Sequence, residues 1–221
     1  KQTAPAASRD VASMTTDELD GAIRAYGAAY ERSPKSKDVG LGYASALQAA
    51  GRNDQSLAVM QQVAINHSED RDVLGAYGKA LAAAGDLPKA LDTIRRAQTP
   101  DNPDWRLLSA EGAILDQLGQ PEKARIMYEK ALAIRPNEPA ILSNLGMSSL
   151  LTNDPKKAET YLSRAAALPG ADPRVRQNLA LAVGLQGRFD EAERIAADVL
   201  SPDEASANVA YLRQMLAQRN T

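Results

Sequence analysis

The chain has 221 residues, with 26 Lys and Arg against 28 Asp and Glu, which gives a formal net charge of −2. This balance argues against a nucleic-acid-binding protein, because such proteins usually carry an excess of basic residues. Hydrophobic residues make up 44% of the chain and charged residues 24%, as in ordinary globular proteins. A single His and no Cys exclude thiol catalysis, disulfides and zinc sites built from Cys and His.

The composition also favours one class of secondary structure. There are 41 Ala but only nine aromatic residues. Ala is the best helix former, whereas strands favour β-branched and aromatic residues. No apolar run approaches the roughly 18 residues that span a bilayer. We therefore predict an all-α protein whose core is built from small side chains.

The N-terminal residues divide into a polar segment and a first helix. Residues 1–14 are rich in Ala, Ser, Thr and Pro and lack helical periodicity, which predicts a flexible tether. Thr15 and Glu18 have the spacing of a capping box, in which each side chain bonds a free backbone N–H at the helix start. Residues 15–36 match only the second half of the repeat described next, so we assign them as a half repeat.

A period of 34 residues runs through the rest of the chain. Five units without insertions are predicted at 37–70, 71–104, 105–138, 139–172 and 173–206. Four columns hold small or turn-forming residues. Position 15 of each unit is Gly51, Gly85, Gly119, Asn153 or Gly187, and position 20 is Ser56, Ala90, Ala124, Ala158 or Ala192. Positions 8 and 27 hold Ala, Gly or Val.

Each column has a physical reason. Gly and Asn tolerate the left-handed backbone that ends a helix, so position 15 predicts the turn between two helices. Small residues at positions 8, 20 and 27 let two antiparallel helices approach closely. Pro34, Pro100, Pro136, Pro169 and Pro202 follow the second helices, which proline cannot continue.

This pattern resembles the tetratricopeptide repeat, most closely in residues 105–138. The resemblance implies an all-α solenoid of antiparallel helix pairs in a right-handed superhelix. Residues 207–221 would form a C-terminal helix that caps the apolar face of the fifth repeat, because each unit buries its core only against its neighbours.

The sequence offers no credible catalytic site. His67 is the only histidine and lies in a predicted connection, so neither a metal site nor a His-activated nucleophile can be assembled. The acidic run at Asp190 and Glu191 falls in the first turn of a helix, where carboxylates favour the helix dipole. We predict no enzyme activity, no cofactor and no metal.

In the tetratricopeptide family, positions 2, 5, 6, 9, 12 and 13 of each repeat face the concave groove. Repeats one and two place mostly small groups there, together with Gln48 and Lys79, and repeat three adds Arg106 and Asp116. The resemblance implies a peptide-binding surface on repeats three to five. Its predicted residues are Ser109, Ala113, Ser143, Asn144, Met147, Leu150, Leu151, Arg174, Gln177, Asn178, Leu181 and Leu185.

Two asparagines one period apart are central to this hypothesis. The amides of Asn144 and Asn178 can both donate to and accept from a peptide backbone, and Met147 can adapt to an apolar side chain. The alternative is that both amides bond only to neighbouring helices. The family's chaperone-binding clamp is a poor match, since Ser109, Ala113 and Asn178 stand where it needs Lys, Asn and Arg.

Residues 169–196 and 207–216 resemble the TadD family of tight-adherence (Flp) pilus systems. That resemblance implies a periplasmic pilotin lipoprotein, anchored to the outer membrane, that binds the pilus secretin, in particular its C-terminal region. The family's lipid-bearing N-terminal Cys is absent from this chain, so the membrane link would be a lipid anchor that the chain lacks. Alternatives are a general scaffold or co-chaperone, which could be cytoplasmic, and the non-catalytic arm of a larger enzyme.

Overall fold

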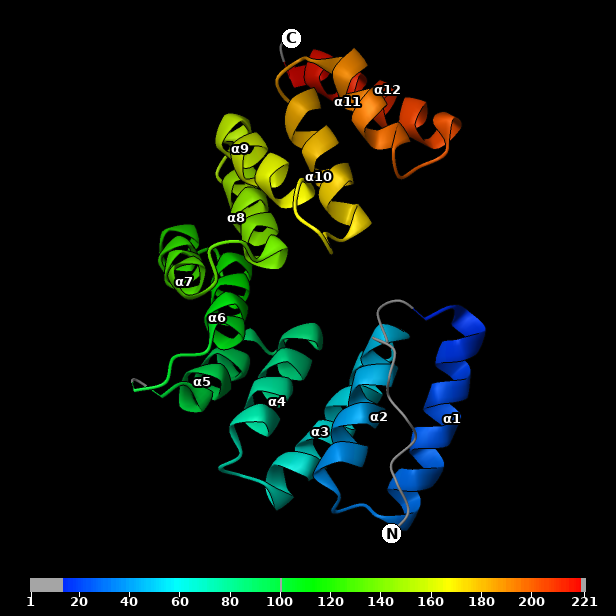
Figure 1. The fold of residues 1–221 in the computed structure, drawn as a ribbon, viewed down its shortest axis with the longest axis vertical. Coiled ribbons are helices and arrows are strands. Elements are labelled where there is room, and N and C mark those ends of the chain that lie inside the picture. Colours follow the sequence, from blue (N-terminus) through cyan, green and yellow to red (C-terminus); the bar gives the residue numbers. More distant parts are fainter. Residues whose placement is uncertain (1–13, 100, 220–221) are drawn as a thin grey trace. The chain divides into compact units, whose positions relative to one another are not determined.

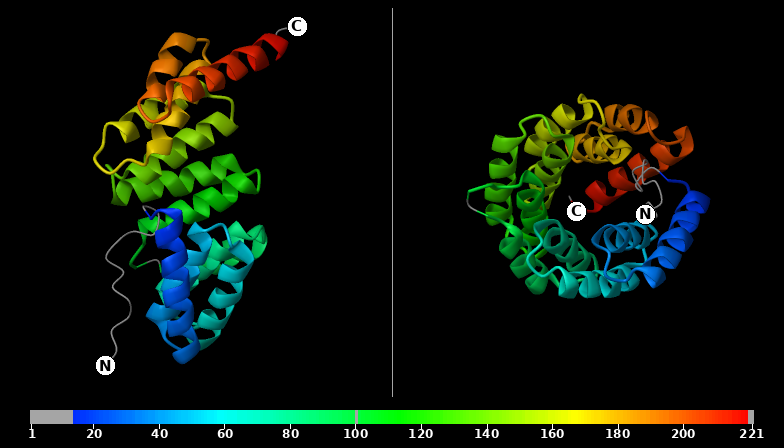
Figure 2. Two further views of the ribbon diagram at one scale, coloured as in Figure 1. Left: turned by 90° about the vertical axis from the view of Figure 1, so that its right-hand side faces the viewer. Right: turned by 60° about the horizontal axis from the view of Figure 1, so that its bottom comes forward.

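The computed structural model describes residues 14–99 and 101–219. These residues form twelve α-helices, and no strand is found among them. Consecutive helices alternate in direction (Figures 1 and 2), as the repeat pattern predicts. The prediction of an all-α fold of antiparallel helix pairs is confirmed. Most of the tether predicted at residues 1–14 lies outside the described residues.

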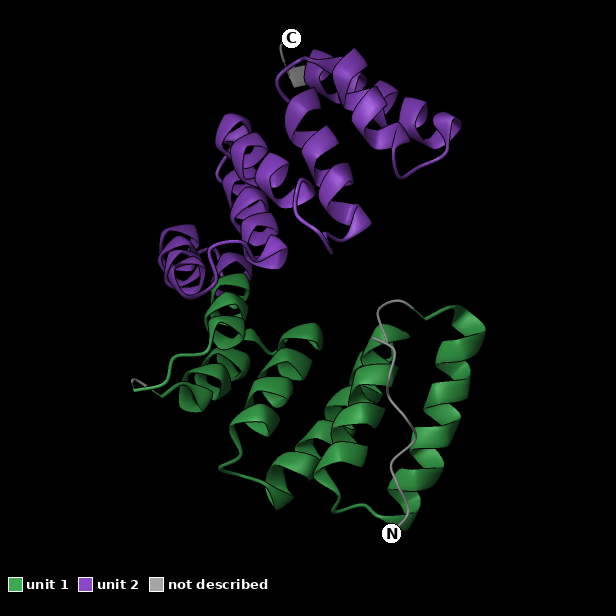
Figure 3. Ribbon diagram, in the orientation of Figure 1, with its two compact units in different colours: residues 1–114 green, residues 115–221 purple. Residues whose placement is uncertain are grey.

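The chain divides into two compact units, residues 1–114 and residues 115–221 (Figure 3). Unit 1 holds five helices and the first part of a sixth: α1 (Thr16–Arg32), α2 (Lys37–Ala49), α3 (Asn53–Asn66), α4 (Arg71–Ala83), α5 (Leu87–Ala97) and α6 (Trp105–Gln117). Unit 2 holds the end of α6 and six more: α7 (Pro121–Ile134), α8 (Pro139–Leu151), α9 (Pro155–Ala166), α10 (Pro173–Gly184), α11 (Phe189–Ala197) and α12 (Pro202–Arg219).

The turns within the helix pairs have the predicted left-handed backbone. In all five repeats the residue at position 15 has a positive φ, from 59° at Asn153 to 89° at Gly85. Asn153 is the only non-glycine residue with a positive φ in the described part of the chain. Asparagine tolerates this conformation better than other side chains do, so it can replace glycine in repeat four.

Side-chain caps fix where the helices begin. Thr15 accepts a hydrogen bond from the backbone N–H of Glu18, whose carboxylate accepts one from the Thr15 N–H at 2.9 Å, so the predicted capping box is confirmed. Asp70, Asp86 and Asp154 cap α4, α5 and α9 in a similar way. These carboxylates satisfy backbone donors that the helix itself leaves unpaired.

In the core of each unit, a large side chain from one helix packs against a small residue of the neighbouring helix. The alanines at position 20, which are Ala90, Ala124, Ala158 and Ala192, are fully buried. A Cβ atom added to Gly78 would lie 2.6 Å from Ile94, and one added to Gly146 would lie 2.5 Å from Leu162. Ile94 and Leu162 are themselves fully buried. Helices within a pair therefore approach until the large side chain of one rests on the backbone of the other.

The fifth repeat departs from the expected pattern. Helix α11 ends at Ala197, before Val199, and Ala196 is the buried residue at its end. The last helix starts at Pro202, not at Ala207. Ser201 and Glu204 form a second capping box, with the Ser201 N–H donating to the Glu204 carboxylate at 3.0 Å. Proline needs no N–H partner at the first position of a helix, so this start is favourable.

The last helix covers the end of unit 2. Its buried residues Ala205, Val209 and Leu212 face the preceding pair, and the Leu212 side chain lies against the backbone of Gly184. Ala205 and Val209 belong to the same buried cluster as Val175 and Leu179 of α10. Helix α12 thus buries the apolar face of the fifth repeat, as a capping helix would.

Candidate functional site

A groove of about 350 Å³ lies between α8 and α10 in unit 2. Five of the residues predicted for peptide binding line it together. They are Ser143, Asn144 and Met147 from α8, and Arg174 and Asn178 from α10. The structure therefore brings the central part of the predicted surface into one concave site, which we call the unit 2 groove.

Helix geometry explains why these residues share the groove. Met147 follows Asn144 by three residues and Ser143 by four, so its side chain lies next to both on one side of α8. The next residues round the helix, Leu142 and Leu145, are fully buried in the core. The core therefore fixes the rotation of α8, and the three half-buried groove residues are held at its edge.

The two groove asparagines differ in their partners. Asn144 makes an interaction within the protein. For the half-buried Asn178 amide, in contrast, no hydrogen bond is found within the described part of the chain. A half-buried amide without a protein partner is more easily satisfied by a ligand than one already bonded. The Asn178 amide is therefore a polar group of this groove that is available to a ligand.

Arg174 is held by the residue that caps its own helix. Its Nη2 lies 2.7 Å from Oδ2 of Asp172, and its backbone N–H donates to Oδ1 at 2.8 Å. The hydrogen bond with Arg174 lowers the pKa of Asp172, and the same contact raises the pKa of Arg174. Both groups line the unit 2 groove, so they contribute a neutral pair and no net positive charge.

The predicted leucines have varied environments. Leu150 is half-buried and packs against the core of unit 2, whereas the Leu151 side chain is 66% exposed. Leu185 is half-buried at the end of α10. Gln177 and Leu181 line a different, largely apolar cavity of about 330 Å³ with residues of α12 that include Tyr211 and Met215.

Two predicted residues belong to the other unit. Ser109 and Ala113 lie on the part of α6 that is in unit 1, where Ser109 is buried and Ala113 half-buried. Both also make interactions within the protein. The prediction that they form part of the same site as Asn144 and Asn178 is not tested by this structure.

The side chain of Asp116, at groove position 12 of repeat three, forms hydrogen bonds with other residues of unit 2. Its carboxylate accepts hydrogen bonds from the Tyr128 and Ser148 hydroxyls, each at 2.9 Å. Loss of solvent raises the pKa of Asp116, although both hydrogen bonds oppose that shift. Burial raises the pKa of Tyr128 well above its ordinary value, and the charge and hydrogen bond of Asp116 raise it further. Asp116 therefore links α6, α7 and α8.

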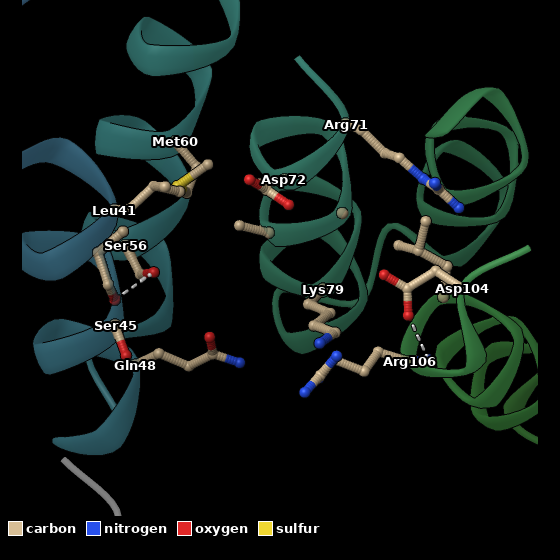
Figure 4. A pocket seen from close by; sticks show the side chains of 14 residues that line it. Leu41, Ser45, Gln48, Ser56, Met60, Arg71, Asp72, Lys79, Asp104 and Arg106 are labelled. Carbon is tan, nitrogen blue, oxygen red and sulfur yellow. Dashed lines mark hydrogen bonds between the residues drawn. The ribbon is translucent and has the colours of Figure 1, made fainter. Parts of the chain in front are cut away.

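A second groove, of about 310 Å³, lies in unit 1 and was not predicted from the sequence. Lys79 of α4 and Arg106 of α6 point toward each other at one end, while Leu41 and Met60 lie at the other (Figure 4). The available signal was a basic side chain at groove positions of two successive repeats. This signal did not suffice to predict a site, because most other groove residues of repeats one and two are small. We call this the unit 1 groove.

Two family models match the repeats of this chain. A family model described as tetratricopeptide repeat matches residues 14–80 and 117–182, and a second model with the same description matches 72–96 and 173–198. The chain belongs to the tetratricopeptide repeat family. Proteins of this family are typically non-enzymatic scaffolds that bind protein or peptide partners.

Solved structures share this fold at low sequence identity. Cut9–Hcn1 from the APC/C matches with a TM-score of 0.72 and 14% identity over 89% of this chain, which spans only 40% of that chain. A thermophilic tetratricopeptide protein of Thermus thermophilus gives 0.70 and 21% over 81% of this chain and 100% of its own. Pseudomonas aeruginosa pilF gives 0.64 and 18%, with 91% and 90% covered. No curated protein matches the sequence significantly.

Neither a metal-binding cluster nor a membrane span is found in the described residues. Within residues 14–99 and 101–219, no three His, Asp or Glu side chains are grouped so that they could hold a metal ion. Each helix in these ranges is too short or too polar to cross a bilayer.

Proposed function

We propose that this tetratricopeptide protein is a non-enzymatic module that holds a peptide segment of a partner protein in the unit 2 groove. The observation that carries the proposal is the half-buried Asn178 amide, which lines a groove with Asn144 and Met147 and lacks a hydrogen-bond partner among the described residues. Asn178 would bond the peptide backbone, and Met147 would contact an apolar side chain next to it. The neutralised Arg174–Asp172 pair favours a ligand without a strong net charge in this part of the groove.

Leu150, Leu151 and Leu185 would extend this contact beyond the groove. Gln177 and Leu181 would act through the neighbouring apolar cavity, and Ser109 and Ala113 through the preceding repeat. These assignments rest on the family's groove positions, which these residues occupy in the 34-residue register.

We further propose that the partner is the secretin of a tight-adherence pilus and that the protein is its pilotin, exported to the periplasm and attached to the outer membrane by a lipid. This rests on the resemblance of residues 169–196 and 207–216 to the TadD family. The similarity to Pseudomonas aeruginosa pilF concerns the fold alone, at 18% identity. A cytoplasmic scaffold that binds an unrelated peptide is the alternative.

The peptide-binding proposal is tested by fluorescence anisotropy with labelled peptides from the secretin C-terminal region. Replacing Asn178 with Ala, alone and together with Asn144→Ala, should weaken binding by about 5- to 150-fold, which corresponds to roughly 1–3 kcal/mol for lost hydrogen bonds. Asn66→Ala, on the exposed face of α3, is the matched control and should bind as the wild type does. Unchanged affinity of the double variant, with the fold intact by circular dichroism, would contradict the proposal.

The pilotin assignment needs a separate experiment. Intact-mass analysis of the protein isolated from its native cells should find an acylated Cys just upstream of Lys1. Pull-down with the secretin should succeed with its C-terminal tail and fail without it. An unmodified Met at a cytoplasmic N-terminus would reject the pilotin role, yet it would leave peptide binding in the unit 2 groove open to the first test.

A further inference from the structure

The unit 1 groove combines charged, polar and apolar groups from three successive helices and the start of a fourth. Ser45 and Gln48 come from α2, Met60 from α3, Lys79 from α4 and Arg106 from α6 (Figure 4). All of them lie in unit 1. Because these side chains are placed by four different helices, the groove is a property of the stacked repeats and not of one segment.

Two cations meet at one end of the groove. The Lys79 ammonium group and the Arg106 guanidinium group point toward each other (Figure 4). The Arg106 guanidinium stacks on the Trp105 ring, with 4.6 Å between its central carbon and the ring centroid. Neither cation makes a salt bridge with a carboxylate in the part of the chain that the structure describes. Two like charges in this arrangement attract an anion that can bond both.

The electrostatics of Lys79 agree with this geometry. Loss of solvent lowers the pKa of its ammonium group. The negative charge of Asp104 raises that pKa and the positive charge of Arg106 lowers it. Asp104 is already engaged, since its Oδ1 accepts a hydrogen bond of 2.7 Å from the backbone N–H of Arg106. Asp104 carries one negative charge against the two positive charges of Lys79 and Arg106, so it offsets them only in part.

Two other charged residues, Arg71 and Asp72, line the groove, and the buried Nε of Arg71 has no hydrogen-bond partner among the described residues. The Arg71 guanidinium donates to the side-chain oxygen of Gln98 and to the backbone oxygen of Asn102, which are neutral acceptors. Asp72 is bound by Lys37, with 3.1 Å between Nζ and Oδ2. Lys37 also binds Asp70, at 2.6 Å, so it offsets Asp72 only in part. The groove lining itself holds three cations, Arg71, Lys79 and Arg106, against the two carboxylates Asp72 and Asp104, which leaves one net positive charge.

We infer that the unit 1 groove is a second binding site that takes an extended peptide segment with one acidic side chain, whose carboxylate bonds both Lys79 and Arg106. Gln48 and Ser45, which line the same groove, would bond the peptide backbone next to it. Leu41, Met60 and Leu107 would contact an apolar neighbour of the acidic residue. This inference goes beyond the proposed function, because it concerns different residues in a different unit.

The surrounding carboxylates explain why one acidic residue is expected, and not a strongly anionic ligand. Asp72 and Asp104 both line the groove. A run of acidic residues, or a nucleic acid, would bring further negative charges close to Asp72 and Asp104, and these like charges would repel each other. A single carboxylate between apolar residues matches the groove in both charge and polarity.

The test uses two matched pools of labelled peptides, capped at both ends so that no terminal charge remains. One pool has a central Glu between randomised apolar residues, and the other has Gln in its place. We expect the full-length protein to bind the Glu pool more tightly, by about 5- to 30-fold, and to lose this preference as salt is added. Equal binding of the two pools would overturn the inference.

Variants test whether the preference for the Glu pool depends on Lys79 and Arg106. Lys79→Gln and Arg106→Gln should each reduce the Glu preference, and the double variant should abolish it. Arg96→Gln, at an exposed position of α5 in the same unit, is the matched control. A Glu preference that survives the double variant would refute the site. Circular dichroism and the melting temperature verify that each variant is folded.

Two further arms separate this mode of binding from capture of a chain end and from binding in the unit 2 groove. Peptides with Gln at the centre and a free C-terminal carboxylate should bind no better than the capped Gln pool, and tighter binding would show that the groove takes chain ends instead. The double variant Asn144→Ala/Asn178→Ala should keep the full Glu preference. Failure of the unit 2 test and failure of this one are therefore distinguishable.

Discussion

Both grooves are lined by residues of the repeat helices, but the grooves differ in how their charged side chains are paired. In the unit 1 groove Lys79 and Arg106 lack carboxylate partners among the described residues, whereas in the unit 2 groove the only arginine is bound by Asp172. The amide of Asn178 and the thioether of Met147 are uncharged, and the Glu138 carboxylate also lines the unit 2 groove, so this groove has no excess of positive charge. The repeat columns that build the helices thus leave the groove positions free to differ between repeats.

The polar contacts made by Asp116 in unit 2 and by Lys37 in unit 1 also differ. In unit 2 the Asp116 carboxylate links three helices through buried hydroxyl groups. In unit 1 a partly exposed pair, Lys37 and Asp70, joins the starts of α2 and α4, with 2.6 Å between Nζ and Oδ2. Partly exposed ion pairs are screened by water and salt, while a buried network loses more when one member is removed.

The largest effect is expected from emptying the equivalent core position in each unit. Ile94 and Leu162 occupy the same repeat position, are fully buried, and each rests on a helix glycine. Ile94→Ala and Leu162→Ala should each lower the free energy of unfolding by about 2–5 kcal/mol, because both create a cavity. Hydrogen exchange should accelerate mainly in the helices next to each change, because repeats contact only their neighbours. Uniform acceleration through the whole chain would contradict this independence.

Overpacking the core should lower the free energy of unfolding somewhat less than creating a cavity does. Ala158 is fully buried between α8 and α9, so the larger side chain of Ala158→Leu forces the pair apart. The expected loss is about 1–3 kcal/mol in the free energy of unfolding, measured by denaturant titration. Ser163→Leu, on the exposed side of α9, is the control. An unchanged stability of Ala158→Leu would show that the assigned repeat register is wrong at this point.

Removal of the half-buried Asp116 carboxylate tests the hydrogen-bond network of unit 2. Asp116→Ala leaves the Tyr128 and Ser148 hydroxyls without their acceptor, which should cost about 1–3 kcal/mol. Asp116→Asn retains one acceptor and should cost less. Thermal unfolding of both variants measures the difference. If Ala and Asn were equally tolerated, the hydrogen-bond network would not stabilise unit 2.

The smallest effect is a difference in pH dependence between the units. The hydrogen bond with Lys37 lowers the pKa of Asp70 below its ordinary value of 3.8. The stability that Asp70 adds is therefore present above that value and is lost as the pH falls through the lower, folded pKa. The stability difference between wild type and Lys37→Met should accordingly shrink on acidification.

Asp116 should behave in the opposite sense. Burial raises its pKa above 3.8, so its contribution is complete below that value and is lost as the pH rises through the folded pKa. Asp116→Asn does not titrate and should gain stability relative to the wild type over that range. Denaturant midpoints measured at several pH values test both units, and parallel pH profiles of the two variants would refute the assigned contrast.

Much of the fold was predictable from local signals. The helices at Lys37, Arg71, Trp105, Pro139 and Pro173 begin where the 34-residue period places each repeat, and the turns at position 15 have the backbone that glycine and asparagine permit. Backbone conformation depends on neighbouring residues, so a repeated pattern of small residues, turns and caps specifies it. The capping box of Ser201 and Glu204 was not predicted, although its spacing was visible in the sequence.

The groove could be predicted only in part. Helical spacing placed Ser143, Asn144 and Met147 on one face, and the period placed Asn178 beside them. The sequence did not reveal that Asp172 would bind Arg174, that Asp116 would turn to Tyr128 and Ser148, or that Lys79 and Arg106 would meet. Local sequence determined which residues are helical and which faces are apolar. The Asp172–Arg174 pair forms within one helix start, but tertiary structure decided the contacts between helices, such as those of Asp116 with Tyr128 and Ser148, because they depend on distances that no single segment encodes.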